Sequence, residues 1–136
     1  MTRLEDGSVL YCTYGTLRLD HGNCKRILQG REGVEHLGTI ETPANYTMYS
    51  MGGFPGVAEG GQTPIVVDVF KVKNEAVMRN VNGLEGYSGV RNDERNWYDT
   101  CDVQTEWGVA NMFTMNELNN EGNRRSIITT GDWTKR

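Results

Sequence analysis

The chain has 136 residues, of which 37% are hydrophobic and 24% charged, and its net charge at pH 7 is −4. This length supports one hydrophobic core, so we expect a single domain over residues 1–136. The mean hydropathy of −0.58 and the aromatic content are those of an ordinary globular protein, and no apolar run is long enough to span a membrane.

The same composition restricts the partners. An acidic protein is poorly suited to nucleic acid, which requires a basic face. The amino terminus has no hydrophobic signal-peptide region, which favours the cytoplasm. The three cysteines lack C-x-x-C spacing and the two histidines form no H-E-x-x-H motif, so neither a disulfide framework nor a metal site is expected. The oligomeric state stays open.

The first expected strand, residues 9–14, is a continuous run of β-forming side chains that stops at Gly15. Glycine permits a tight bend and a close approach of another segment. The turn that follows exposes consecutive backbone N–H groups, which can bind a carboxylate or a phosphate, and Arg18 offers a positive charge beside them. An ordinary strand end is the alternative, and it fits the same pattern.

Short strand-like segments between glycine-rich turns predict an α+β fold with a mainly antiparallel sheet. In the first half of the chain we expect strands at residues 36–42, 46–51 and 64–72, the last of them central to the sheet. Residues 52–61 contain several glycines and are expected to be a loop. Its Phe54 and Pro55 could line a pocket, although a flexible connection is equally consistent with this composition.

One helix is clearly predicted. Asn74 is a favourable N-cap, and Val77, Val81 and Leu84 follow at helical spacing on one face. The helix is expected to end or distort near residues 82–83, because glycine is unfavourable inside a helix.

The last third of the chain is predicted to add a hairpin of residues 98–106 and 109–115 around a turn at Trp107 and Gly108. Residues 126–130 would form a short final strand. The polar residues 116–125 are expected to form a loop or a helical turn, and Trp133 is expected to pack back on the domain.

Glu85 directly follows the apolar face of the predicted helix and lies four residues beyond Val81. Its carboxylate is therefore expected near the buried side of the helix end. Apolar surroundings raise the pKa of a carboxyl group and make it a better proton shuttle near neutral pH. The alternative is a solvent-facing glutamate, which a rotation of one residue would produce.

Two motifs resemble those of the gamma-glutamylcyclotransferase-like family, whose members carry Y-G-[ST]-[LN] after an amino-terminal strand and an acidic L-E-G segment after a central strand. Here residues 14–17 read Y-G-T-L and residues 84–87 read L-E-G-Y. The resemblance is closest to the small bacterial and phage branch. Further segments match in the same order along nearly the whole chain, namely residues 49–56, residues 66–72, Tyr98 and residues 131–133.

The resemblance implies a single-domain α+β fold with a mainly antiparallel or mixed, β-barrel-like sheet and flanking helices. It implies an enzyme that releases 5-oxoproline and a free amine from a γ-glutamyl amine or γ-glutamyl amino acid, without a cofactor. In this reaction the α-amine attacks the γ-carbonyl of the same glutamyl group, and Glu85 transfers the protons. The residues implied to bind the substrate are Tyr14, Gly15, Thr16, Leu17, Arg18 and Tyr98.

The sequence departs from the family pattern at two places. Asn82 replaces the usual aspartate before L-E-G, and residues 88–97 form a long polar stretch that could reshape or cover the mouth of the pocket. Two other functions remain open. A protein that binds or sequesters a small molecule would keep the pocket without turnover. A protein-interaction module would be favoured if Arg18 and Glu85 lay far apart.

Overall fold

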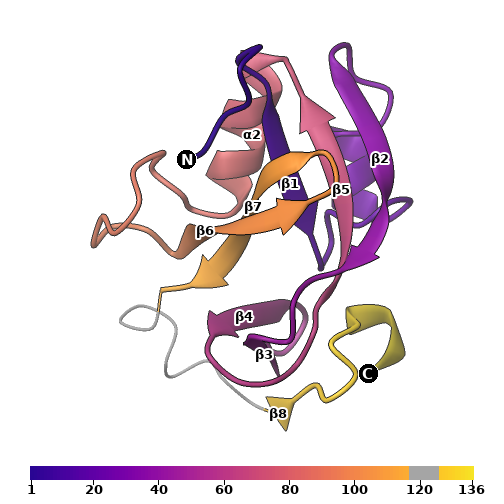
Figure 1. The fold of residues 1–136 in the computed structure, drawn as a ribbon, viewed down its shortest axis with the longest axis vertical. Coiled ribbons are helices and arrows are strands. Elements are labelled where there is room, and N and C mark those ends of the chain that lie inside the picture. The colour runs from indigo at the N-terminus through magenta and orange to yellow at the C-terminus, as the bar shows by residue number, and fades with distance from the viewer. Residues whose placement is uncertain (117–125) are drawn as a thin grey trace.

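The computed structural model describes residues 1–116 and 126–136. These residues form two sheets and two α-helices (Figure 1). Strands β1–β5 and helix α1 come from the first half of the chain, and α2, β6, β7 and β8 follow. The bounds are β1 Val9–Thr13, α1 Gly22–Ile27, β2 Val34–Glu41, β3 Tyr46–Ser50, β4 Pro55–Glu59, β5 Val66–Val72, α2 Glu75–Leu84, β6 Tyr98–Thr105, β7 Gly108–Met115 and β8 Ser126–Ile127, with a 3₁₀ helix at Trp133–Lys135.

The larger sheet has five strands in the order β2-β5-β1-β7-β6. β1 and β7 pair in parallel, and the other neighbours pair antiparallel. The smaller sheet has the order β4-β3-β8 and is antiparallel. The predicted α+β class with a mainly antiparallel, mixed sheet is confirmed. The five-stranded sheet is open, with β2 and β6 at its edges, and β1 rather than β5 is its middle strand.

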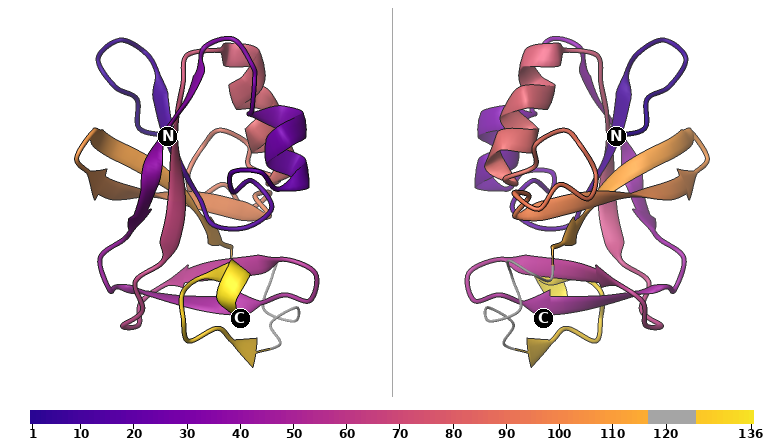
Figure 2. Two further views of the ribbon diagram at one scale, coloured as in Figure 1. Left: turned by 90° about the vertical axis from the view of Figure 1, so that its right-hand side faces the viewer. Right: turned by 90° about the vertical axis from the view of Figure 1, so that its left-hand side faces the viewer.

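Both faces of β1 are buried, which explains why its sequence is a continuous apolar run rather than an alternation. Val9 and Tyr11 face one hydrophobic cluster, which also contains the buried side chains of α1 and α2. Leu10 and Cys12 face a second cluster, to which Trp133 contributes, so this aromatic packs against the fold as predicted. Both helices cover the same side of the large sheet, and the small sheet lies beyond one end of it (Figure 2).

Residues 52–61 are not a continuous loop as predicted. β4 occupies Pro55–Glu59 and pairs with β3, with Ser50 opposite Pro55. Glycine fits this strand because a Cβ atom on Gly56 would lie 2.8 Å from Cγ of Met115. The close contact with β7 therefore compensates for the low strand propensity of glycine.

Helix α1 was not predicted, because six residues are too few to display a helical period. It buries Cys24 and Ile27. Its first turn is joined to the turn after β1 by a hydrogen bond of 3.2 Å from the N–H of Cys24 to the carbonyl of Thr16. Tertiary contacts rather than local propensity therefore stabilise this helix.

Helix α2 begins as predicted, since the side chain of Asn74 accepts hydrogen bonds from the N–H groups of Ala76 and Val77. Its end differs from the prediction: it continues through Gly83 to Leu84. The buried face consists of Val77, Met78 and Val81, whereas Leu84 is 40% exposed.

Near the carboxyl terminus, β8 covers only Ser126–Ile127 of the expected strand 126–130. Most of the expected 116–125 segment lies outside the described residues. In the described part of the chain, no helix is long and apolar enough to cross a membrane.

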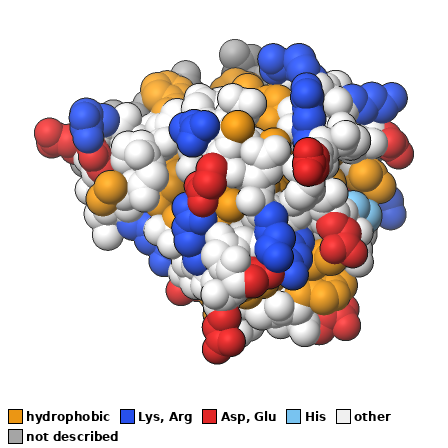
Figure 3. Space-filling model, turned by 90° about the horizontal axis from the view of Figure 1, so that it is seen from above, with side chains coloured by type: hydrophobic (Ala, Val, Ile, Leu, Met, Phe, Trp, Pro, Cys, Tyr) orange, Lys and Arg blue, Asp and Glu red, His pale blue; other side chains and the backbone are white. Residues whose placement is uncertain are grey.

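Charged side chains of both signs intermingle on the face seen in Figure 3. Exposed ion pairs join Arg3 to Glu75 and both Lys71 and Lys73 to Asp6. They connect the amino-terminal turn to the end of β5 and the start of α2. Such exposed pairs each contribute about 1 kcal/mol or less, so the two hydrophobic clusters carry most of the stability.

Candidate active site

A cavity of about 340 Å³ lies at the carboxyl end of β1. Its wall is formed by the turn after β1, the first turn of α1, the β3–β4 turn, the end of α2 and the start of β6. This volume suits a small-molecule ligand. Of the predicted site residues, the cavity is lined by Tyr14, Gly15, Thr16, Leu17, Glu85 and Tyr98.

Glu85 lies at the carboxyl end of α2, where the chain turns sharply. Gly86 has a φ of 64°, a left-handed conformation that favours glycine. The N–H of Tyr87 donates to the carbonyl of Asn82 at 2.8 Å, and the N–H of Gly86 donates to that of Gly83 at 3.2 Å. This pair of bonds is a Schellman motif, so the L-E-G segment is a helix stop that places Glu85 in the wall of the cavity.

Burial raises the pKa of the Glu85 carboxyl group from 4.5 to about 7. The residue is half-buried, because the cavity leaves part of it open to solvent. Its place at the negative end of the α2 dipole acts in the same direction. Near neutral pH this carboxyl group is therefore divided between its protonated and ionised forms, as an acid–base catalyst requires.

Two tyrosines flank this carboxyl group. The hydroxyl of Tyr14 donates to the carbonyl of Phe113 at 2.7 Å, and that of Tyr98 donates to the carbonyl of Pro55 at 2.9 Å. Burial raises the pKa of both phenols, and the charge of Glu85 adds to the effect. Both rings therefore stay neutral, with their protons bound to the backbone.

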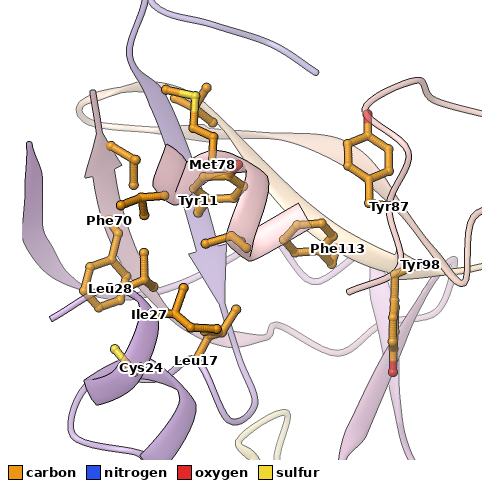
Figure 4. Packing of buried hydrophobic residues seen from close by; sticks show 14 of the residues in the cluster. Tyr11, Leu17, Cys24, Ile27, Leu28, Phe70, Met78, Tyr87, Tyr98 and Phe113 are labelled. Carbon is orange, nitrogen blue, oxygen red and sulfur yellow. The ribbon is translucent and has the colours of Figure 1, made fainter. Parts of the chain in front are cut away.

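Aromatic packing supports the floor of the cavity. Phe113 lines the cavity and lies between Tyr11 and Tyr87 (Figure 4). Its ring stacks on Tyr11 at 5.9 Å between centroids and meets Tyr87 edge-on at 6.0 Å. The hydroxyl of Tyr11 then donates to Oδ1 of Asn82 at 3.0 Å, so the asparagine that replaces the usual aspartate holds a core tyrosine.

The turn after β1 carries backbone donors without a protein partner. In the described part of the chain, the N–H groups of Gly15, Thr16 and Leu17 donate to no protein acceptor. The turn is held instead by the N–H of Arg18, which donates to the carbonyl of Gly15 at 3.0 Å. Three successive donors without a protein partner can bind an anionic oxygen. Leu17 offers only its backbone here, because its side chain is buried in the core.

Arg18 does not line the cavity. Its Nε lies 3.1 Å from Oδ2 of Asp68 in β5, and its Nη1 lies 2.9 Å from Oδ1 of Asp132. The same Asp68 oxygen accepts the N–H of Leu19 at 2.9 Å. The arginine side chain is only 12% exposed, so its charge is neutralised by two carboxylates and anchors the turn from behind. The sequence could not reveal this, because Asp132 lies 114 residues away.

Residues outside the predicted substrate-binding set also line the cavity. Asn23 of α1 donates from Nδ2 to Oγ1 of Thr16 at 2.7 Å. Phe54 and Pro55 line the cavity, as one of the two alternatives for residues 52–61 predicted. Leu84 and Trp97 also line it. In the sequence, the only indication that Leu84 and Trp97 would line the cavity is that they directly precede Glu85 and Tyr98.

The polar stretch 88–97 forms a loop beside the cavity, and backbone hydrogen bonds join the two ends of this loop. The N–H of Trp97 donates to the carbonyl of Gly86 at 2.9 Å, and that of Tyr98 donates to the carbonyl of Glu85 at 3.2 Å. Inside the loop, Asn96 is fully buried and accepts the N–H of Ser88 at 2.8 Å. Of this stretch only Trp97 lines the cavity. Closure of this loop on Gly86 therefore places Trp97, and Tyr98 directly after it, in the wall of the cavity that Glu85 lines.

Replacing Gly86 by alanine should destabilise this corner. The left-handed backbone costs a non-glycine residue about 1 to 2 kcal/mol, and the added Cβ would lie 2.8 Å from Cβ of Trp97. We expect urea denaturation to show a loss of about 2 kcal/mol or more. Gly83→Ala is the matched control, because Gly83 lies in the helix with open space around it and alanine should stabilise it by up to about 1 kcal/mol. Equal effects of the two changes would contradict this account.

Replacing Gly15 by alanine should affect the site more than the stability. The new Cβ would lie 3.0 Å from Cγ and Cδ of Pro55, and the carbonyl of Pro55 holds the hydroxyl of Tyr98. We expect a loss of about tenfold in ligand affinity or turnover, since small displacements of binding groups are costly. Gly22→Ala, which meets nothing within 4 Å, should have no such effect.

Comparisons with known proteins show the family of this chain. The family model described as "Gamma-glutamyl cyclotransferase, AIG2-like" matches residues 11–135. The chain belongs to this family. A relative from Vibrio cholerae serotype O1 named "Putative gamma-glutamylcyclotransferase" is 29% identical over 127 residues, which are 93% of this chain and 96% of the relative.

Solved structures of similar fold include an AIG2-like protein. The protein PH0828 from Pyrococcus horikoshii has a TM-score of 0.67 at 22% identity, over 92% of this chain and 89% of that one. The AIG2-like protein of Mus musculus has a TM-score of 0.61 at 17% identity, over 80% of this chain and 78% of that one. At these identities the likeness shows the AIG2-like fold alone.

Proposed function

We propose that the protein is a gamma-glutamylcyclotransferase that releases 5-oxoproline and a free amine from a small γ-glutamyl compound. The observation that carries this proposal is the arrangement of one cavity. Glu85, with a pKa of about 7, lines the same cavity as Gly15, Thr16 and Leu17, whose N–H groups have no acceptor among the described residues. Family membership supports the reaction type.

The proposed reaction begins with binding of the γ-glutamyl group. The three free N–H groups hold either its α-carboxylate or the oxyanion that develops on the γ-carbonyl, and one well-placed donor lowers an acyl-transfer barrier by about 3 kcal/mol. Arg18 is not needed in the cavity for this role, because backbone donors bind an anion by themselves. Its ion pairs to Asp68 and Asp132 hold the turn in place instead.

Proton transfer is assigned to Glu85. Its carboxylate takes a proton from the substrate α-ammonium, and the freed amine attacks the γ-carbonyl carbon to form a five-membered ring. The ring nitrogen then loses its second proton to water, and the oxyanion re-forms the carbonyl. The bond from this carbon to the leaving nitrogen breaks as protonated Glu85 gives its proton to that nitrogen, and the released amine takes its further proton from the solvent. The attack is intramolecular, so proximity is supplied by the substrate, and one carboxyl group performs both transfers.

The test is detection of 5-oxoproline by mass spectrometry after incubation with γ-glutamyl amines and γ-glutamyl amino acids. We expect product with the native protein and almost none with Glu85→Gln. The matched control is Glu106→Gln, an exposed glutamate in the β6–β7 turn, which should retain full activity. Ligand binding without product from any substrate would overturn the proposal and favour a protein that sequesters a γ-glutamyl compound.

A further inference from the structure

The rim of the cavity gathers exposed apolar side chains. Among the described residues, five large hydrophobic side chains are exposed, and three of them line this one cavity: Phe54 at 39%, Leu84 at 40% and Trp97 at 40%. They come from the β3–β4 turn, the end of α2 and the residue before β6. Three separate segments thus place apolar surface at the mouth of one cavity. Such a cluster is typical of a binding surface, whereas single exposed hydrophobic residues are common on any protein.

The cavity wall is also poor in charge. Of the described residues that line it, only Glu85 carries a carboxyl, amine, guanidinium or imidazole group. Arg18, the nearest basic residue along the chain, is committed to Asp68 and Asp132. Among the described residues, the anion-binding groups of the wall are therefore the backbone donors of the turn after β1, which suffice for the γ-glutamyl group itself.

A leaving group that carries its own carboxylate would be poorly accommodated. After the turn has bound the γ-glutamyl group, a second carboxylate would meet the apolar rim and the negative form of Glu85, with no basic side chain among the described residues of the wall. Burying an unpaired charge against apolar surface is unfavourable, and like charges repel. An apolar leaving group would instead cover Phe54, Leu84 and Trp97 and remove their surface from water.

We infer that the leaving amine is apolar and lacks a carboxylate, as in an alkylamine or an arylalkylamine. This inference rests on the proposed function, since it names the substrate class of the same site. The γ-glutamyl end is held at the turn after β1, the scissile bond lies near Glu85, and the apolar part of the amine lies on the rim.

The experiment compares two matched substrates. γ-Glutamylphenethylamine and γ-glutamylphenylalanine share the same ring and differ by one carboxylate, so their kcat/KM ratio isolates the effect of that charge. We expect the phenethylamine derivative to be favoured about tenfold or more. γ-Glutamylethylamine serves as the third substrate and should be turned over less well than the phenethylamine derivative, because it covers less of the rim.

Variants assign the preference to the rim. Phe54→Ala and Leu84→Ala should each lower the ratio of phenethylamine to ethylamine turnover several-fold, because both remove apolar contact area. Val90→Ala is the control: Val90 is 62% exposed, lies outside the cavity and should leave the ratio unchanged. An unchanged ratio in both rim variants, or equal turnover of the phenylalanine and phenethylamine derivatives, would overturn the inference.

Failure of the proposed reaction would be visible separately. If no substrate releases 5-oxoproline, the dissociation constants of the same pair are compared by calorimetry. Binding of the phenethylamine derivative about tenfold more tightly then supports the apolar rim even without turnover. Equal affinities would overturn the inference about the rim as well.

Discussion

Glu85→Gln should lower kcat for 5-oxoproline release by about 10² to 10⁴, the usual range for a general acid–base catalyst. Glutamine keeps the size of the side chain and removes its proton chemistry. In the native protein, kcat/KM should rise with pH and level off above an apparent pKa of about 7, because the ionised carboxylate starts the reaction. A variant that retains more than about a tenth of the native kcat would exclude this role for Glu85.

The same substitution should stabilise the protein at alkaline pH. The pKa of Glu85 is about 7 in the folded state against 4.5 ordinarily, so its protonated form favours folding. That contribution is complete below about pH 4.5 and is lost as the pH rises through about 7. We therefore expect Glu85→Gln to unfold with a free energy about 1 to 3 kcal/mol above the native value at pH 8, and with a similar one at pH 4.5.

Urea denaturation at the two pH values measures this difference. A glutamine variant that is less stable than the native protein at pH 8 would show that the carboxylate has a favourable partner in the folded state. The proposed site predicts the opposite. A carboxyl group with a raised pKa is destabilising to the folded protein when it is ionised, and the substrate ammonium would provide its favourable partner.

Asp68→Ala should produce the largest loss of stability, about 3 to 5 kcal/mol, which is the usual cost of removing one member of a buried ion pair. Asp68 is 2% exposed and accepts hydrogen bonds from Arg18, the N–H of Leu19 and the hydroxyl of Thr39, with His36 Nε2 at 3.1 Å. Without it, Arg18 keeps only Asp132 as an ionic partner. Turnover should fall as well, because this network holds the turn that carries the backbone donors.

The matched control for this change is Asp102→Ala. Asp102 also binds an arginine, with its Oδ1 2.6 Å from Nη2 of Arg91, but its side chain is 49% exposed. Its loss should cost about 1 kcal/mol or less, and denaturant unfolding compares the two variants directly. Equal losses would show that burial does not govern the strength of the Asp68 network.

The pKa of Asp68 adds a pH dependence to this second prediction. Burial acts to raise that pKa, but the hydrogen bonds from Thr39 and Leu19 and the charge of Arg18 outweigh it, so the pKa lies below its ordinary value of 3.8. The contribution of Asp68 to stability is therefore present above about pH 4 and is lost as the pH falls through the lowered pKa. Asp68→Ala should unfold less steeply with acid than the native protein.

Local pattern was sufficient for several features of the fold and of the candidate site. The apolar run of β1 ending at Gly15, the N-cap Asn74 with the apolar face of α2, and the hairpin of β6 and β7 follow from short-range rules of capping, period and turn chemistry. These features depend on neighbours within a few residues, which a sequence displays directly. The helix stop at Gly86 was not predicted, because the helix was expected to end near residues 82–83, and it is this stop that places Glu85 directly after the buried face.

The tertiary structure decided the rest. Helix α1 is too short to show a period, and β4 forms from glycine-rich sequence because Met115 packs against Gly56. Arg18 is drawn to Asp68 and Asp132, which lie 50 and 114 residues away in sequence. Trp97 reaches the cavity only because the 88–97 loop closes on Gly86. A sequence shows which chemistry each residue can perform. Packing determines which distant residues become partners, and it places both the turn after β1 and Glu85 in the wall of one cavity.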